Sequence, residues 1–137
     1  MTSVAINEAR EALYQRWVDN WTGTGAGTFV FDNESAPSID TAWERISFKN
    51  EESEQDTLGP VGSRQFLRQG LLDIRIFTPK DEGLQNADLL GEEARDIYEG
   101  ASFNGLWTHG FLVREIGPGG NFWETQVIGN VFYREEK

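Results

Sequence analysis

Apolar residues near the start of the chain recur at the spacing of a helix stripe. Intervals of three, four and four residues separate them, with charged or amide side chains between; the four are Ile6, Ala9, Leu13 and Trp17. This spacing places apolar side chains on one face of an α-helix. The pattern predicts an amphipathic helix over residues 3–20, and Ser3 or Thr2 is placed to cap its first turn.

A second helix is predicted over residues 84–99, where the apolar positions again follow helical spacing; they are Ala87, Leu90, Ala94 and Ile97. Gly91 lies in its middle, where glycine costs up to about 1 kcal/mol relative to alanine, so we expect close packing against a sheet. The glycine-rich stretch 22–27 follows a helix and precedes a strand. A phosphate-binding loop has the opposite context, and this stretch is interpreted as a flexible connection.

A long strand is predicted over residues 64–78, because its apolar residues share one parity; they are Phe66, Leu72, Ile74 and Ile76. Thirteen residues from Phe66 onward span roughly 43 Å at about 3.3 Å each. A compact domain of this length has a diameter of only about 37 Å. The strand therefore either bends at Gly70 or projects beyond the domain.

Shorter alternating segments predict further strands at 29–31, 43–48, 107–116 and 122–133. The polar run 51–63 is interpreted as a hairpin tip, and residues 134–137 as a solvated end. Helices and strands in this order predict one α+β domain over residues 1–137. We expect a single mostly antiparallel β-sheet with two α-helices packed against it and a long projecting β-hairpin.

Composition narrows the possible partners. The chain of 137 residues has a formal net charge of −11 and no cysteine. An acidic chain is a poor ligand for nucleic acid or an anionic membrane, because phosphate contacts need an excess of Lys and Arg. Without cysteine, the fold does not depend on an oxidising compartment. With neither a signal peptide nor a long apolar run, the chain is expected to be soluble and cytosolic.

Few residues suggest chemistry, and we assign no catalytic, cofactor-binding or metal-binding residue. His109 is the only histidine and is interpreted as a structural strand residue. The acidic run Glu51, Glu52, Glu54 and Asp56 lacks the pattern of a calcium-binding loop and a second wall that could form a sugar-binding cleft. Glu92 and Glu93 lie on an outward face of the predicted helix. Both groups are therefore interpreted as solvated charge. Basic residues beside Phe66 have too many acidic neighbours for a single-strand nucleic-acid site.

The order of these segments resembles the tail terminator (tail completion) proteins of long-tailed bacteriophages. The resemblance covers nearly the whole chain and rests on order and spacing. Its pieces are Phe29–Asn33 with Pro37, the strand Trp43–Phe48, the tip Thr57–Gly59, the strand Arg68–Pro79 with Gly83, the helix with Ala87, Leu90 and Ala94, and the closing segments Trp123–Val127 and Phe132–Tyr133.

The resemblance implies a structural virion protein without enzymatic activity or cofactor. Such proteins form a six-fold homo-oligomeric ring at the head-proximal end of the tail tube, stop tube elongation and present a surface to the head–tail connector or head-closure protein. The ring would assemble in the host cytoplasm, and DNA would pass through it without specific binding. We expect Glu51, Glu52, Glu54 and Asp56 to line the lumen, and Leu58, Gly59, Phe66 and Arg68 to reach a neighbouring subunit.

Two other interpretations stay open. A head-closure or neck component, or a tail tube subunit, would use similar small rings of sheet and helix. A small ligand-binding or hydrolytic α+β domain is the more remote alternative, since fold alone does not determine function. In that case His109 would be the residue whose replacement abolishes activity.

Overall fold

The computed structural model describes residues 3–23 and 28–137. The described elements are α1 (Ile6–Asn20), β1 (Thr28–Phe31), β2 (Trp43–Gln55), β3 (Gln65–Pro79), α2 (Gln85–Tyr98), β4 (Ser102–Phe103), β5 (Leu106–Gly119) and β6 (Phe122–Glu136). The strands form one sheet in the order β1-β2-β3-β6-β5-β4, in which only the β1–β2 pair is parallel. The predicted α+β fold with a single, mostly antiparallel sheet is confirmed.

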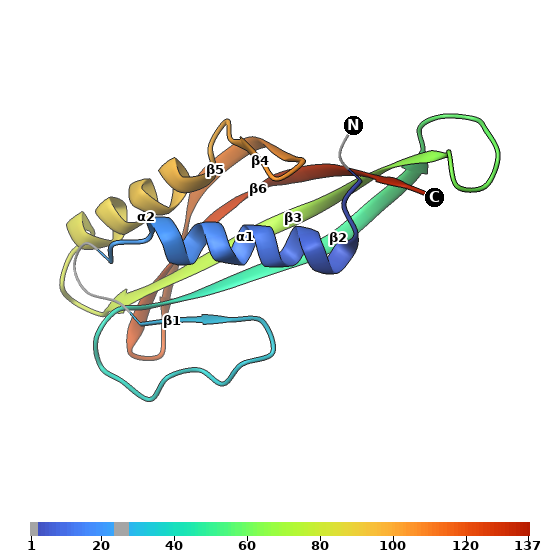
Figure 1. Cartoon of the computed structure of the whole chain (residues 1–137). Coiled ribbons are helices and arrows are strands. Elements are labelled where there is room, and N and C mark those ends of the chain that lie inside the picture. The colour runs from blue at the N-terminus through green and yellow to red at the C-terminus, as the bar shows by residue number, and fades with distance from the viewer. Residues whose placement is uncertain (1–2, 24–27) are drawn as a thin grey trace.

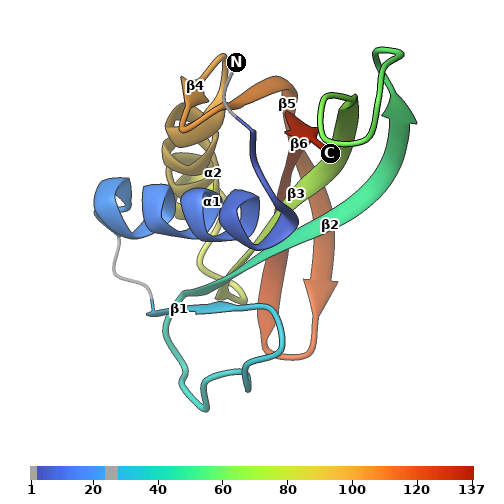
Figure 2. The ribbon, with the colours of Figure 1, turned by 45° about the vertical axis from the view of Figure 1, so that its right-hand side comes forward.

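Both helices pack on the same face of a curled sheet, as Figures 1 and 2 show. Their buried side chains meet alternate residues of the strands; the core includes Leu13, Trp17, Leu90, Ala94, Ile46, Leu72, Ile74, Ile76 and Val127. The parity predicted for β3 therefore marks the core face. One member of the predicted α1 stripe is different: Ile6 is half exposed, because the helix begins there, beyond the packed centre of the sheet.

The close packing predicted at Gly91 of α2 is confirmed. A Cβ atom at this position would lie 3.1 Å from Cγ1 of Val113 on β5. A contact this short would need Val113 to move, so the glycine allows the helix axis to approach the sheet closely. Helix propensity is lost at this position in exchange for close packing.

The helix-free face of the sheet carries an aromatic cluster and a charged network. The rings of Trp43 and Phe77 stack with centroids 4.2 Å apart. On β3, Arg75 forms ion pairs with Asp73 and with Glu124 of β6. Opposite charges on neighbouring strand positions support each other in this way, so this face is ordered without a covering layer.

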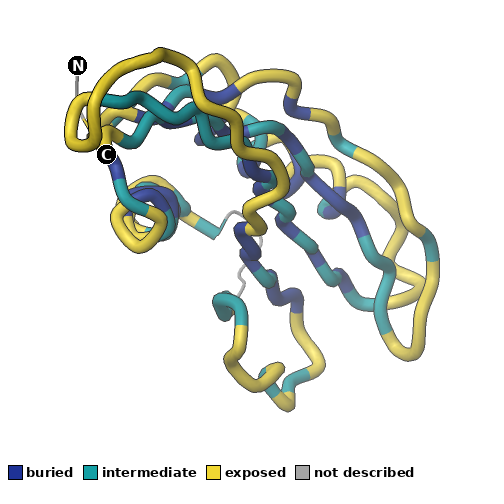
Figure 3. Tube along the Cα trace, turned by 90° about the vertical axis from the view of Figure 1, so that its right-hand side faces the viewer, coloured by how far each residue is buried: buried dark blue, intermediate teal, exposed yellow. Residues whose placement is uncertain are grey.

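The strands β2, β3 and β6 continue past the helices as a projecting arm, to the right in Figure 1. We call residues 49–55, 65–71 and 130–136 the arm and residues 57–64 the tip loop. Every residue of the β2 part is exposed, as Figure 3 also shows. The predicted projection is confirmed, and Gly70 packs beneath the ring of Phe48.

Two predicted boundaries within the arm are wrong. The run 51–55, predicted as a hairpin tip, is strand, because it pairs with β3 after a register shift between Asn50 and Glu52. Residues 134–136, predicted as a solvated end, also pair with β3 over its first three residues. The arm therefore has three strands, which makes it stiffer than a two-stranded hairpin.

The segment before α1 is fastened to the arm. The Val4 amide donates to the Arg134 carbonyl at 2.9 Å, and the Glu136 amide donates to the Ser3 hydroxyl at 2.9 Å. The predicted capping of α1 by Ser3 is therefore wrong; the Glu8 carboxylate instead accepts from the Ala5 amide at 2.9 Å. The predicted Thr2 cap and positions 24–27 of the predicted connection lie outside the described residues.

Candidate functional site

The tip loop presents two apolar side chains to solvent at the end of the arm. Leu58 is 94% exposed and Val61 is 82% exposed. The loop turns through Gly59 and Gly62, whose φ angles of 153° and 98° disfavour other residues. Folding of the single chain gains nothing from these two side chains, because neither leaves water.

The base of the tip loop is held by the strand ends on either side of it. The carboxylate of Asp56 forms an ion pair with Arg134 at 2.6 Å. The backbones of Arg64 and Lys137 exchange two hydrogen bonds of 3.1 and 2.8 Å, and the Thr57 hydroxyl accepts from the Gln65 amide at 2.9 Å. The loop is therefore presented on a structured base.

The four residues predicted to reach a neighbour fall into two groups. Leu58 and Gly59 lie in the tip loop. Phe66 and Arg68 lie on β3, where the Arg68 guanidinium stands 4.9 Å from the Phe66 ring centre and pairs with Glu135 of β6 at 2.9 Å. The second group thus packs within its own arm and supports the first.

The structure also divides the predicted acidic set. Glu52 and Glu54 alternate along β2 opposite Gln69 and Leu67, so they share one face of the arm. Glu51 sits at the register shift, and Asp56 is paired with Arg134. Glu51 and Glu52 also border a groove of about 340 Å³ beside Ile6 and Tyr133.

His109 is exposed on β5, opposite Asn130 and just before an irregularity in the strand. Within residues 3–23 and 28–137, no group of three or more His, Asp or Glu side chains is arranged to hold a metal ion. Neither of the two described helices is long and apolar enough to cross a lipid bilayer.

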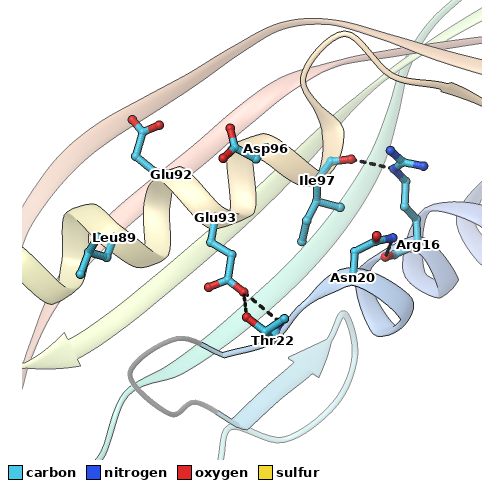
Figure 4. Close-up of a pocket in the computed structure, with 8 residues that line it drawn as sticks. All are labelled: Arg16, Asn20, Thr22, Leu89, Glu92, Glu93, Asp96 and Ile97. Carbon is cyan, nitrogen blue, oxygen red and sulfur yellow. Dashed lines mark hydrogen bonds between the residues drawn. The ribbon is translucent and has the colours of Figure 1, made fainter.

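A cleft between the end of α1 and the outer side of α2 was not predicted. It measures about 500 Å³ and is lined by Arg16, Asn20, Thr22, Leu89, Glu92, Glu93, Asp96 and Ile97. Figure 4 shows Glu93 reaching from α2 to Thr22, whose amide donates to it at 2.8 Å, and Arg16 reaching the Ile97 carbonyl at 2.7 Å. Leu89 is half exposed. Only the packing of the two helices brings these residues together, so no local motif could have marked them.

Beside this junction, Glu44 on β2 is completely buried. Neither of its carboxylate oxygens has a hydrogen-bond partner among the described residues. Burial raises the pKa of Glu44 to about 8, since the charged form loses its hydration; the Trp21 indole opposes the shift and Glu93 adds to it. At neutral pH this side chain is largely protonated, and it occupies a strand position whose parity belongs to the core.

Comparison with known proteins bears on the fold alone. No family model and no curated protein matches the chain. One solved structure, of a protein without a descriptive name, is similar with a TM-score of 0.69 over 94% of this chain and 95% of the other, at 14% sequence identity. This likeness shows that the two chains share the same overall fold.

Proposed function

We propose that this chain is a structural subunit that assembles with copies of itself into a ring at the head-proximal end of a bacteriophage tail tube. The ring stops tube elongation and presents a docking surface to the head–tail connector. The observation that carries the proposal is the arm, with Leu58 and Val61 94% and 82% exposed at its end. Apolar side chains held in water on a structured support are characteristic of protein contact sites.

The position of the tip favours a ring over a symmetric dimer. The arm lies at one end of the molecule and the body of the sheet and helices at the other (Figure 1). A contact between an arm and a different surface of the next copy is head-to-tail, and head-to-tail contacts close into rings when the rotation allows it. Six copies, the virion location and assembly in the host cytoplasm follow from the resemblance to tail terminator proteins.

The charge of the chain is compatible with a genome passing through the ring. At −11 per subunit, the assembled ring would repel phosphate, because counterion release requires clustered Lys and Arg. Glu52 and Glu54 share one face of the arm and are the members of the predicted acidic set best placed to face a lumen. Tight duplex binding that does not depend on salt would contradict this part of the proposal.

Native mass spectrometry with negative-stain microscopy tests the assembly. We expect closed rings from the wild-type chain, and their loss in the double variant Leu58→Ser/Val61→Ser. The matched control is Leu112→Ser/Ile116→Ser, which removes two apolar side chains that are 52% and 46% exposed on β5. The control should still form rings. Rings from the tip variant at wild-type concentrations would contradict the proposal.

The product of assembly separates the alternatives. A tube subunit elongates into long tubes, whereas a terminator stops at rings and shortens tubes when added to the polymerising tail tube protein of the same phage. A ring that binds the connector but never caps a tube would indicate a neck component. A substrate whose turnover disappears in His109→Ala would indicate a hydrolytic domain instead.

A further inference from the structure

In Figure 1 the tip loop lies at one end of the molecule, and the C-terminal end of α1 with α2, which line the cleft, lies at the other. They cannot meet within one chain. We propose that the cleft receives the tip loop of a second copy of this chain. The inference rests on the proposed ring and adds the surface that each arm contacts.

The apolar parts of the two surfaces correspond. Leu58 and Val61 project from a loop that has no other large apolar side chain. The cleft of about 500 Å³ has Ile97 and the half-exposed Leu89 among its lining residues. Docking would remove apolar surface from water on both sides, which is the main driving force for association.

The charges also correspond. Three carboxylates and one guanidinium line the cleft; they belong to Glu92, Glu93, Asp96 and Arg16. Glu92 is paired with Arg95 of its own helix at 2.6 Å. With that pair counted, the cleft is acidic by one charge. The tip loop contains a single charged residue, Arg64. Its backbone pairs with that of Lys137, and its side chain lies over the Phe66 ring and donates to the Lys137 carbonyl at 3.4 Å. A cation at the base of an apolar tip complements an acidic rim around an apolar floor.

Other surfaces also offer exposed apolar side chains, and two of them carry the most exposed ones outside the tip loop. The groove along the arm has Ile6, which is 50% exposed, and the body of β5 has Leu112, which is 52% exposed. The groove carries Arg68 beside its acidic residues, and that guanidinium is already paired with Glu135. These surfaces are the competing positions that an experiment must separate from the cleft.

The chain has no cysteine, so engineered pairs report contacts without background. We would prepare the full-length variants L58C/L89C, L58C/L112C and L58C/I6C, oxidise them mildly and follow disulfide-linked multimers on non-reducing gels. Leu89, Leu112 and Ile6 are exposed to 49, 52 and 50% respectively, which matches the thiols for access. We expect the 58–89 pair to link about tenfold faster than either control, because docking raises the effective concentration.

A charge exchange gives an independent readout. Arg64→Asp and Asp96→Arg should each raise the concentration needed for ring formation by about tenfold, the effect of one lost charge contact. The double variant should restore it. Asp96 is exposed and Arg64 is partly buried at the base of the tip loop. Circular dichroism with thermal unfolding checks that each variant is folded.

The outcomes separate this inference from the proposed function. Rings that form while the 58–112 or 58–6 pair links as fast as 58–89, or while no pair links above collision rate, overturn the docking of the tip in the cleft and leave the ring intact. Failure of the charge exchange to restore assembly counts against it as well. A wild-type chain that forms no ring at any concentration, alone or with tail tubes, overturns both.

Discussion

The hydroxyl of Tyr98 donates a hydrogen bond of 2.6 Å to the backbone carbonyl of Leu13. Both residues are completely buried, and they join the last turn of α2 to the middle of α1. Burial raises the pKa of Tyr98, so the hydroxyl stays protonated and able to donate at neutral pH. This bond sets how the two helices meet, and hence the walls of the cleft between them.

Replacing Tyr98 with phenylalanine should therefore destabilise the fold by about 1–2 kcal/mol, because the hydrogen bond is lost while the ring still fills its place. Urea unfolding followed by circular dichroism measures the change. Tyr14→Phe is the control, since the Tyr14 hydroxyl is buried without a hydrogen-bond partner among the described residues. An equal loss in both variants would show that the Tyr98 bond contributes nothing specific.

Glu44 predicts a pH-dependent stability. Its pKa is raised from 4.5 to about 8 in the fold, so the folded state holds a proton that the unfolded state releases. The full contribution of Glu44 to the free energy of unfolding is present below about pH 4.5. Between about pH 4.5 and 8 this contribution falls as pH rises, by about 1.4 kcal/mol per pH unit. Glu44→Gln should flatten the profile measured by urea unfolding at pH 5, 7 and 9. Glu82→Gln, in an exposed turn, should keep the wild-type slope.

Gly70 should tolerate no side chain. A Cβ atom there would lie 2.6 Å from the Lys49 carbonyl oxygen, which belongs to the neighbouring strand's backbone and cannot rotate away. Gly70→Ala is expected to cost about 1–3 kcal/mol, the usual range for overpacking. Gly119→Ala is the matched control, because no atom lies within 4 Å of its Cβ position. Equal melting temperatures for the two variants would argue against the close contact between Gly70 and the Lys49 carbonyl.

The pair Arg68–Glu135 should stabilise the arm locally. Both side chains are about one-fifth exposed and lie 2.9 Å apart. Arg68→Met keeps the apolar stem against Phe66 but leaves the Glu135 carboxylate with only the longer 3.9 Å ion pair to Lys137. The global cost should stay within about 1 kcal/mol. Hydrogen exchange of residues 65–69 and 134–136 should accelerate, because this outer part of the arm opens separately from the core, which includes Val131 and Tyr133. Lys49→Met, at an exposed position of the same arm, should leave exchange unchanged.

The local sequence pattern was sufficient to predict both helices and the face of β3 that lies in the core. Leu72, Ile74 and Ile76 alternate with polar residues, and alternation has one physical meaning in a half-buried strand. Gly91 was likewise readable, since an unfavourable residue in a helix centre needs a packing reason. These features depend on near neighbours in the chain, so the amino-acid order alone determined them.

Features that depend on distant partners were decided by the tertiary structure. The run 51–55 is polar enough for a loop, but the backbone of β3 beside it supplies hydrogen bonds that make it strand. Ser3 could cap a helix, but its hydroxyl instead accepts a hydrogen bond from the Glu136 amide at the end of β6. Arg16 and Glu93, which both line the cleft, are more than half the chain apart in sequence. On β2, Glu44 occupies a core-facing position in the same way as Ile46. Local propensity differs by less than about 1 kcal/mol between such alternatives, so the contacts available after packing determine which one forms.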